Sequence, residues 1–147
     1  MSPENDTDLL APPFATKVAI LLRDDLAAWQ RMNVTAFLAS GIAAAHPELV
    51  GEPYRDADGG SYVPLLGMPV LVFEGGIREL ANARARAVSR GLRPAIYTEE
   101  MFKTGYDAAN RAATEGVPAE ELNLVGIAVH GPKNGVDKIL KGAHLHP

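Results

Sequence analysis

The sequence contains no cysteine, which excludes disulfide bonds, zinc-thiolate and iron–sulfur sites, c-type haem attachment and a cysteine nucleophile. It also lacks any run of about eighteen apolar residues, the length that a membrane-spanning helix needs. The N-terminus is polar and acidic, without the basic and apolar regions of a secretory signal. We therefore expect a soluble, cytoplasmic protein that does not enter a membrane.

Basic residues are in deficit, because 14 lysines and arginines face 18 aspartates and glutamates, for a formal net charge of -4. This balance argues against a nucleic-acid partner, whose phosphates a protein neutralises with positive charge. Neither a Gly-x-Gly-x-x-Gly nor a Gly-Lys-Ser/Thr motif occurs, so we expect no nucleotide cofactor. We also expect no metal, since the histidines lack the spacing of metal ligands; they are His46, His130, His144 and His146.

The 147 residues, 47% of them hydrophobic, suit one compact domain. We expect an N-terminal tail over residues 1–15 and a single α/β domain over residues 16–147. The apolar, β-branched stretches predict strands, and apolar residues at helical spacing predict helices in the segments between them. This alternation predicts a three-layer α/β sandwich whose mostly parallel or mixed sheet has about four strands, with helices on both faces. The strands are expected at 17–23, 69–74, 93–98 and 122–129, and the helices from residue 26 to 46 and at 77–90, 99–115 and 136–141.

The connections between these elements carry their own signals. Either Asp24 or Asp25 is expected to cap the first helix, because a carboxylate there accepts unpaired backbone N–H groups. Residues 51–60 are dense in turn formers and predict a surface loop, and residues 131–135 predict a turn before the last helix. The C-terminal residues 144–146 are expected to form a solvated tail.

The opening and closing segments and four internal blocks resemble those of a known family. The matching residues are Lys17-Val-Ala-Ile-Leu-Leu-Arg-Asp-Asp-Leu26, Asp25-Leu-Ala-Ala-Trp29, Asn33-Val-Thr-Ala-Phe-Leu38, Glu100-Met-Phe-Lys-Thr104, Asn110-Arg111, Val125-Gly-Ile127, Gly131-Pro132 and Asp137-Lys-Ile-Leu-Lys-Gly142. They are similar to the bacterial domain-of-unknown-function family 2000, and the similarity covers most of residues 17 to 147. That family resembles the type 2 peptidyl-tRNA hydrolases in fold, so the resemblance implies a peptidyl-tRNA-hydrolase-like fold.

The resemblance to the hydrolases also implies positions for site residues. The aspartate that follows their third strand is matched by Glu99 or Glu100. Their nearby threonine is matched by Thr104, and the threonine that opens their last strand by Asn123. A lysine of their first helix falls in the segment that starts here at Asn33. Loss of that cation removes a contact to phosphate or an oxyanion, which counts against a tRNA substrate.

The carboxyl ends of parallel strands favour a polar crevice, since ligands of open α/β sheets bind at that edge. The first strand ends at Arg23 and Asp24, and the third ends at Glu99. We expect these two strands to pair in parallel, which would set their ends side by side. In one interpretation Asp24 or Glu99 is a general base, while Asn33 and Thr104 hydrogen-bond a carbonyl or amide. In the alternative, the aspartates only cap the helix and Arg23 is their salt-bridge partner.

Two further polar residues belong to the candidate ligand-binding set. Asn123 lies at the start of the last expected strand, and His130 comes directly after the end of that strand. His130 is either a titrating group of the site or a hydrogen-bonded structural histidine.

These observations leave more than one function open. The leading hypothesis is a metal-independent hydrolase or transferase that acts on an amide or ester of a small molecule. The alternative is a non-catalytic module that binds a metabolite or a protein at the same crevice, and a weaker alternative is hydrolysis of peptidyl-tRNA or aminoacyl-tRNA. We further expect a homodimer, from the hydrolase resemblance and the apolar content of so small a chain.

Overall fold

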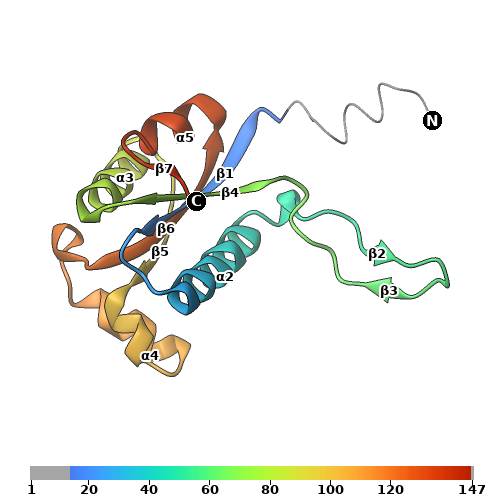
Figure 1. Cartoon of the computed structure of the whole chain (residues 1–147), viewed down its shortest axis with the longest axis horizontal. Coiled ribbons are helices and arrows are strands. Elements are labelled where there is room, and N and C mark those ends of the chain that lie inside the picture. The colour runs from blue at the N-terminus through green and yellow to red at the C-terminus, as the bar shows by residue number, and fades with distance from the viewer. Residues whose placement is uncertain (1–13, 147) are drawn as a thin grey trace.

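A computed structural model of the chain describes residues 14–146. Its centre is a five-stranded sheet in the order β5-β6-β1-β4-β7 (Figure 1). The pair β1 and β4 is parallel and the other three pairs are antiparallel, so the sheet is mixed. The strands are β1 (Thr16–Arg23), β4 (Val70–Gly75), β5 (Ala95–Thr98), β6 (Leu124–Pro132) and β7 (His144–Leu145).

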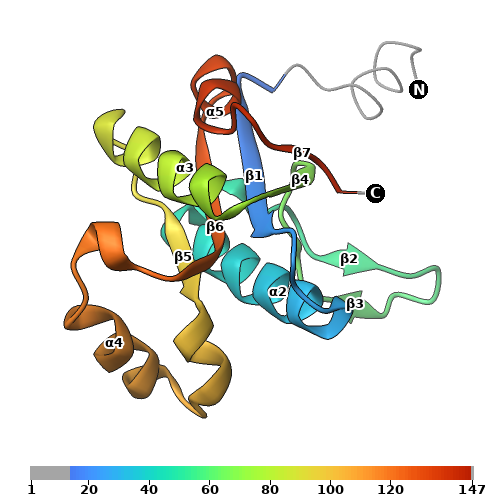
Figure 2. The same ribbon diagram turned by 60° about the vertical axis from the view of Figure 1, so that its left-hand side comes forward.

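Four α-helices pack around this sheet, which confirms the predicted α/β class. Helix α2 covers one face, and α3 and α5 cover the other, while α4 lies beyond the β5 edge (Figure 2). The helices are α2 (Ala28–Ala45), α3 (Ile77–Ser89), α4 (Asp107–Glu115) and α5 (Lys133–Ile139), with 3-10 turns η1 (Pro47–Leu49), η2 (Glu99–Lys103) and η3 (Ala119–Glu121).

The central strand β1 is buried on both faces, as its unbroken apolar run predicts. Val18 and Ile20 point to the α2 side, whereas Ala19 and Leu21 point to the α3 and α5 side. Because successive side chains of a strand face opposite ways, one apolar strand supplies both cores. This places β1 in the middle of the sheet rather than at an edge.

Helix α2 docks on the sheet through residues spaced one turn apart. Val34, Leu38 and Ile42 are all buried against the strands. Beneath them lies Gly126 of β6, where an added Cβ atom would come within 2.5 Å of the Val34 Cγ1 atom. The missing side chain therefore lets α2 approach the sheet closely.

The predicted capping of this helix by an aspartate is wrong. The N-cap is Ala27, and its backbone N–H donates to the Gln30 Oε1 atom at 2.9 Å. Asp24 and Asp25 do not occupy the capping position, because the buried Leu26 lies between them and the N-cap residue.

Three other expectations about the elements need correction. The expected turn at 131–135 is instead the end of β6, which runs to Pro132, and α5 begins directly at Lys133. The expected helix at 99–115 is divided into η2 and α4. The expected solvated tail at 144–146 forms β7, which pairs with β4 through His144 opposite Glu74. A two-residue strand is too short to show any periodicity in sequence.

The expected surface loop at 51–60 lies in a two-stranded ribbon that projects from the body (Figure 1). Its strands are β2 (Tyr54–Arg55) and β3 (Ser61–Tyr62), paired antiparallel. At the base of the ribbon, Gly51 N donates to Leu65 O at 2.8 Å. We call residues 51–66 the arm.

Within residues 14–146, no helix combines the length and apolar character that crossing a membrane requires. Most of the predicted N-terminal tail, residues 1–13, lies outside the described residues.

Candidate functional site

The carboxyl ends of β1 and β5 lie at the same edge of the sheet, as predicted, but the expected direct pairing of these two strands is wrong. Strand β6 lies between them and pairs antiparallel with both, which leaves β1 and β5 running the same way. The Arg23 guanidinium reaches across this gap to the Glu99 Oε1 atom at 3.1 Å. Arg23 also donates to Asn123 Oδ1 at 3.1 Å, and Asn123 Nδ2 donates to Glu99 Oε2 at 2.7 Å.

This cluster controls the ionisation of Glu99. The hydrogen bond from Asn123 and then the interactions with Arg23 lower the pKa of the Glu99 carboxyl below its usual value. The general-base interpretation would favour the opposite shift, toward neutral pH. Glu99 is therefore held as an ion that Arg23 and Asn123 stabilise, and it is a weak base.

The two aspartates at this edge differ in their partners. Arg23 Nε contacts Asp25 Oδ1 at 2.6 Å, as the salt-bridge interpretation predicts. Burial lowers the pKa of Arg23, but hydrogen bonds to Asp25 and Glu99 outweigh it and raise that pKa. Asp24 is exposed, and its backbone is held by Gly75 O at 3.0 Å and by the Arg31 guanidinium at 3.0 Å.

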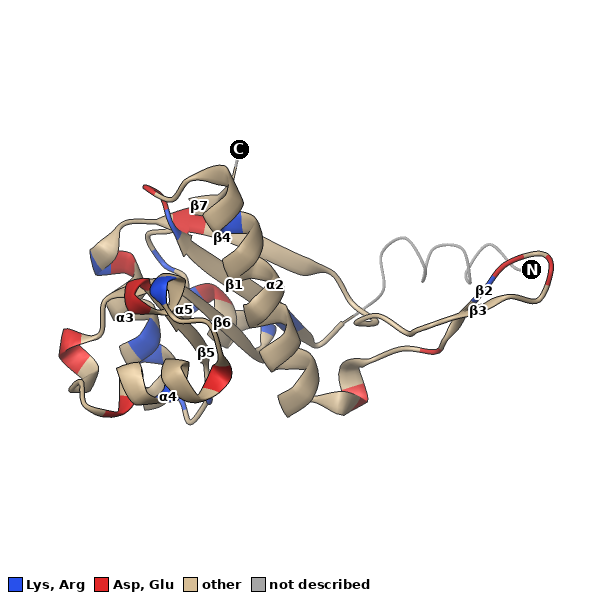
Figure 3. Cartoon of the chain, turned by 90° about the horizontal axis from the view of Figure 1, so that it is seen from below, with Lys and Arg blue, Asp and Glu red and all other residues tan. Residues whose placement is uncertain are grey.

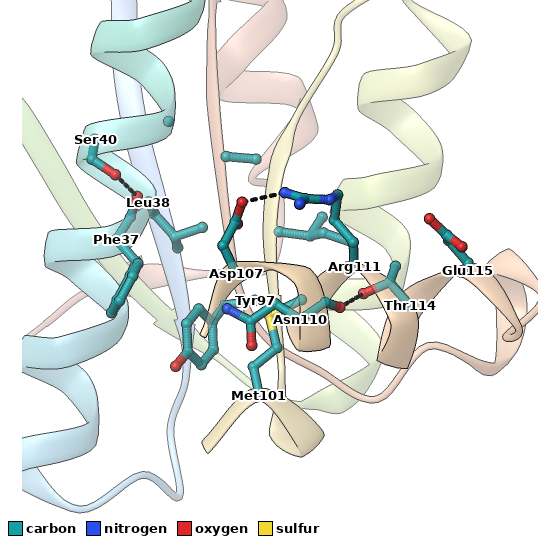
Figure 4. Close-up of a pocket in the computed structure, with 13 residues that line it drawn as sticks. Phe37, Leu38, Ser40, Tyr97, Met101, Asp107, Asn110, Arg111, Thr114 and Glu115 are labelled. Carbon is teal, nitrogen blue, oxygen red and sulfur yellow. Dashed lines mark hydrogen bonds and ion pairs between the residues drawn. The ribbon is translucent and has the colours of Figure 1, made fainter. Parts of the chain in front are cut away.

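Asn33 and Thr104 line a different place, a groove between α2 on one side and η2 and α4 on the other. Two adjoining hollows of about 570 Å³ and 400 Å³ form it. Figure 4 shows the larger hollow, with α2 side chains facing those of α4 across β5. We call this feature the α2–α4 groove. The hollows share Phe37, Tyr97, Met101, Asp107 and Asn110.

A row of aromatic rings from α2, β5 and η2 runs along the groove. Trp29 lies edge-on to Phe102 with ring centroids 5.6 Å apart, and Phe102 lies 5.3 Å from Tyr97. Tyr97 in turn lies 5.7 Å from Phe37. The row therefore runs from the first turn of α2 to its middle. Rings in such offset and edge contacts hold one another in place.

Polar groups stand beside these rings. Asn33 Nδ2 donates to the Tyr97 hydroxyl at 3.2 Å. The Thr104 hydroxyl contacts the Met101 carbonyl oxygen at 2.9 Å and the side-chain amide of Asn110. The groove thus combines an apolar row with neutral amides and hydroxyls, the usual composition of a small-molecule site.

The described lining of the groove holds one cation, Arg111, and two carboxylates, Asp107 and Glu115. Asp107 and Arg111 form an ion pair one helical turn apart on α4 (Figure 4). Among the described residues that line the groove, none is a histidine or a lysine. The groove therefore offers neutral hydrogen bonding rather than a strong positive field.

His130 lies at the opposite end of β6, away from the other predicted residues. It stands opposite Val18 near the start of β1, with its ring centroid 4.7 Å from that of His46. Its Nε2 atom is buried without a hydrogen-bond partner among residues 14–146. Burial, and then the nearby His46, lower its pKa. The structure thus separates His130 from Asn123 and from the groove.

Sequence reasoning selected Asn33 and Thr104 as candidates but missed two groove residues. Tyr97 alternates with Ile96 on β5, so it looks like an ordinary core residue of that strand. Asn110 lies inside α4, and the family resemblance includes the pair Asn110-Arg111 without giving either residue a role. Only the hydrogen bonds to Asn33 and Thr104 reveal their place in the groove.

A buried ion pair on the other side of α2 was also missed. Arg31 Nη1 lies 2.5 Å from Glu74 Oε2, and Glu74 is buried at the end of β4. The same guanidinium donates to Leu26 O at 3.1 Å, which ties the start of α2 to the sheet.

Comparison with known proteins adds a family and a close structural relative. A family model described as "Protein of unknown function (DUF2000)" matches residues 16–147. A solved structure of the protein of unknown function Atu0240 from Agrobacterium tumefaciens strain C58 is 46% identical, with a TM-score of 0.88. The match covers 91% of this chain and 99% of that chain. Among curated proteins, no match was found.

Proposed function

Because this chain belongs to the DUF2000 family, which is described only as of unknown function, we propose its role from its own groove: it binds a small organic molecule that carries an amide or ester group. The observation that carries this proposal is the α2–α4 groove, where a row of aromatic rings stands beside the hydrogen-bonded pair Asn33 and Tyr97.

The aromatic row accounts for an apolar part of the ligand. Trp29 and Phe37 are each more than half exposed, although aromatic side chains of this size usually gain stability from burial. A ligand body lying along the row would remove these ring surfaces from water. The two hollows, of about 570 Å³ and 400 Å³, give it the room that small-molecule sites provide.

The neutral polar groups account for the amide or ester. The Tyr97 hydroxyl accepts a hydrogen bond from Asn33, which leaves its own proton to donate. That proton suits a carbonyl oxygen of the ligand. Thr104 and Asn110 supply a further hydroxyl and amide to the lining.

The charges of the groove argue against a polynucleotide. Among the described residues of its lining, Arg111 is the one cation, it is paired with Asp107, and Glu115 adds a further negative charge. Phosphate recognition needs uncompensated positive charge, so tRNA is the poorer ligand.

A second candidate is hydrolysis of that amide or ester, acting without a metal. It is favoured by the resemblance of the opening and closing segments to type 2 peptidyl-tRNA hydrolases. With this candidate we also propose that the chain has a fold like that of these hydrolases. The Tyr97 hydroxyl, held by Asn33, would polarise the carbonyl. Binding without turnover is the better-supported role, because the carboxylate Glu99 is held as an ion by Arg23 and Asn123.

The fluorescence of Trp29, the single tryptophan of the chain, tests the proposal. The probes are N-acetyl-L-phenylalaninamide, the matching methyl ester and their alanine counterparts. We expect saturable quenching that is stronger for the phenylalanine compounds. Tyr97→Phe should weaken binding about three- to ten-fold, the value of one hydrogen bond, while the exposed Tyr54→Phe should leave it unchanged.

Release of methanol from the ester separates the two candidates. Quenching without methanol supports a binding module, and methanol release that Tyr97→Phe abolishes supports the hydrolase. Absence of quenching by every probe at millimolar concentration would overturn the proposal.

A further inference from the structure

We infer that two copies of this chain associate by laying the arm of each across the outer face of helix α2 of the other. Both surfaces expose large apolar side chains, and the arm also carries charged residues around its tip. The arm extends away from the body beyond the C-terminal end of α2 (Figures 1 and 3). The inference concerns assembly and stands apart from the ligand of the groove.

Helix α2 has an apolar outer face that its own chain leaves uncovered. Arg31 is the single charged residue of its 18 residues. Met32 is 67% exposed, and Ala28 and Ala36 beside it are also exposed. In Figure 3 the α2 ribbon is tan over nearly all its length. A surface helix normally turns charged and polar residues to the solvent, so the exposed Met32 and its alanine neighbours form an unusual apolar stripe.

The arm is the second exposed apolar surface. Val63 is 77% exposed, and Leu65, Tyr54 and Tyr62 are each more than half exposed. An isolated two-stranded ribbon is at best marginally stable in water, so an arm of this kind needs a surface to pack on.

The shape of the arm is nevertheless fixed by its own hydrogen bonds. At the tip, Asp56 Oδ1 accepts from the backbone N–H groups of Asp58 at 2.9 Å and Gly60 at 2.8 Å. The Tyr62 hydroxyl donates to Asp56 Oδ2 at 2.6 Å. The arm is therefore preorganised, which lowers the entropy lost when it docks.

The occupant is a second copy because the two surfaces complement each other within one chain. A two-fold interface uses the same patch on both subunits, so the arm of one copy on the α2 face of the other is matched by the reverse contact. Outside the groove, the exposed apolar side chains of both surfaces add up to on the order of 600 Å² per copy, which is the lower end of what one partner contributes to a stable interface. They are Met32 of α2 and Tyr54, Tyr62, Val63 and Leu65 of the arm.

The first test is mass in solution. Light scattering at micromolar concentration should give twice the chain mass of 15.6 kDa. Met32→Lys on α2 and Leu65→Lys on the arm should each shift the mass to that of one chain. Val88→Lys, at an exposed apolar position on α3, is the matched control and should keep the double mass. Circular dichroism shows whether each variant is folded.

The second test uses the absence of cysteine. A Val63→Cys chain is mixed with a Met32→Cys chain and treated with a short bis-maleimide. We expect a covalent product of double mass that contains one chain of each kind, whereas Val63→Cys mixed with Val88→Cys should give little. A wild-type mass of one chain would overturn the inference, and so would equal cross-linking of the two mixtures.

Discussion

Arg23 and Glu99 are joined at 3.1 Å although they are 76 residues apart in sequence and their strands are not neighbours. Asn123, which precedes the strand between them, contacts both side chains. The three residues thus tie together the ends of β1 and β5 and the start of β6. Because their hydrogen bonds are made to one another, we assign this cluster to the stability of the sheet edge.

Replacing Glu99 tests that assignment. The lowered pKa of its carboxyl means that the ionised form is stabilised in the folded protein. Its contribution is present above the ordinary glutamate value of 4.5 and is lost as the pH falls through the lower folded value. Glu99→Gln should therefore lower the melting temperature at pH 7, and this difference should shrink on acidification.

The neighbouring exposed residue provides the control for this experiment. Glu100→Gln should leave the melting temperature unchanged at either pH. If Glu99→Gln instead abolishes probe binding in the groove and leaves the melting temperature intact, Glu99 belongs to the site and not to the sheet edge.

His130 should give the protein a second dependence on pH. Its pKa is lowered by burial, so the unfolded chain binds a proton more readily than the folded one. Stability is therefore full above the ordinary histidine value of 6.5 and decreases as the pH falls below it. The melting temperature of His130→Phe should decrease less between pH 7.5 and about pH 5.5 than that of the wild type. The same slope in both proteins would contradict this account, and His144→Gln, in the exposed β7, serves as control.

Gly126 should not tolerate even a methyl group. Its added Cβ atom would lie 2.5 Å from Val34 Cγ1 and 2.9 Å from Leu38 Cδ1, which are buried between α2 and the sheet. Gly126→Ala should destabilise the fold by about 1–3 kcal/mol, because α2 must shift or its side chains must leave their preferred rotamers. Gly116→Ala, where no atom lies within 4 Å, is the control, and equal unfolding midpoints in urea for both variants would refute the close approach.

Much of the fold could be predicted because its elements carry local signals. The apolar run at 17–23 indicates a strand buried on both faces. A glycine directly after the expected helix at 77–90 is typical of a helix end, and Gly91 adopts a φ of 76° just beyond α3. The pairing of strands could not be predicted in the same way. Nothing in the sequence of β6 shows that it separates β1 from β5, because pairing depends on contacts between distant segments.

The candidate site was predictable to a smaller degree. Arg23 and Glu99 follow strands that end at one edge, so their proximity follows from the topology. Asn33 and Thr104 lie instead in the groove, whose other wall is formed by α4. The break between η2 and α4 places that wall, and the polar sequence at 99–115 shows only helix-favouring residues there.

The most direct test of the central claim is a crystal structure of the protein soaked with N-acetyl-L-phenylalaninamide. We predict density for the compound in the α2–α4 groove, with its ring along Trp29 and Phe37 and a carbonyl oxygen within hydrogen-bond distance of the Tyr97 hydroxyl. Density in another part of the molecule, together with an empty groove at a saturating concentration, would contradict the assignment of the groove as the ligand site.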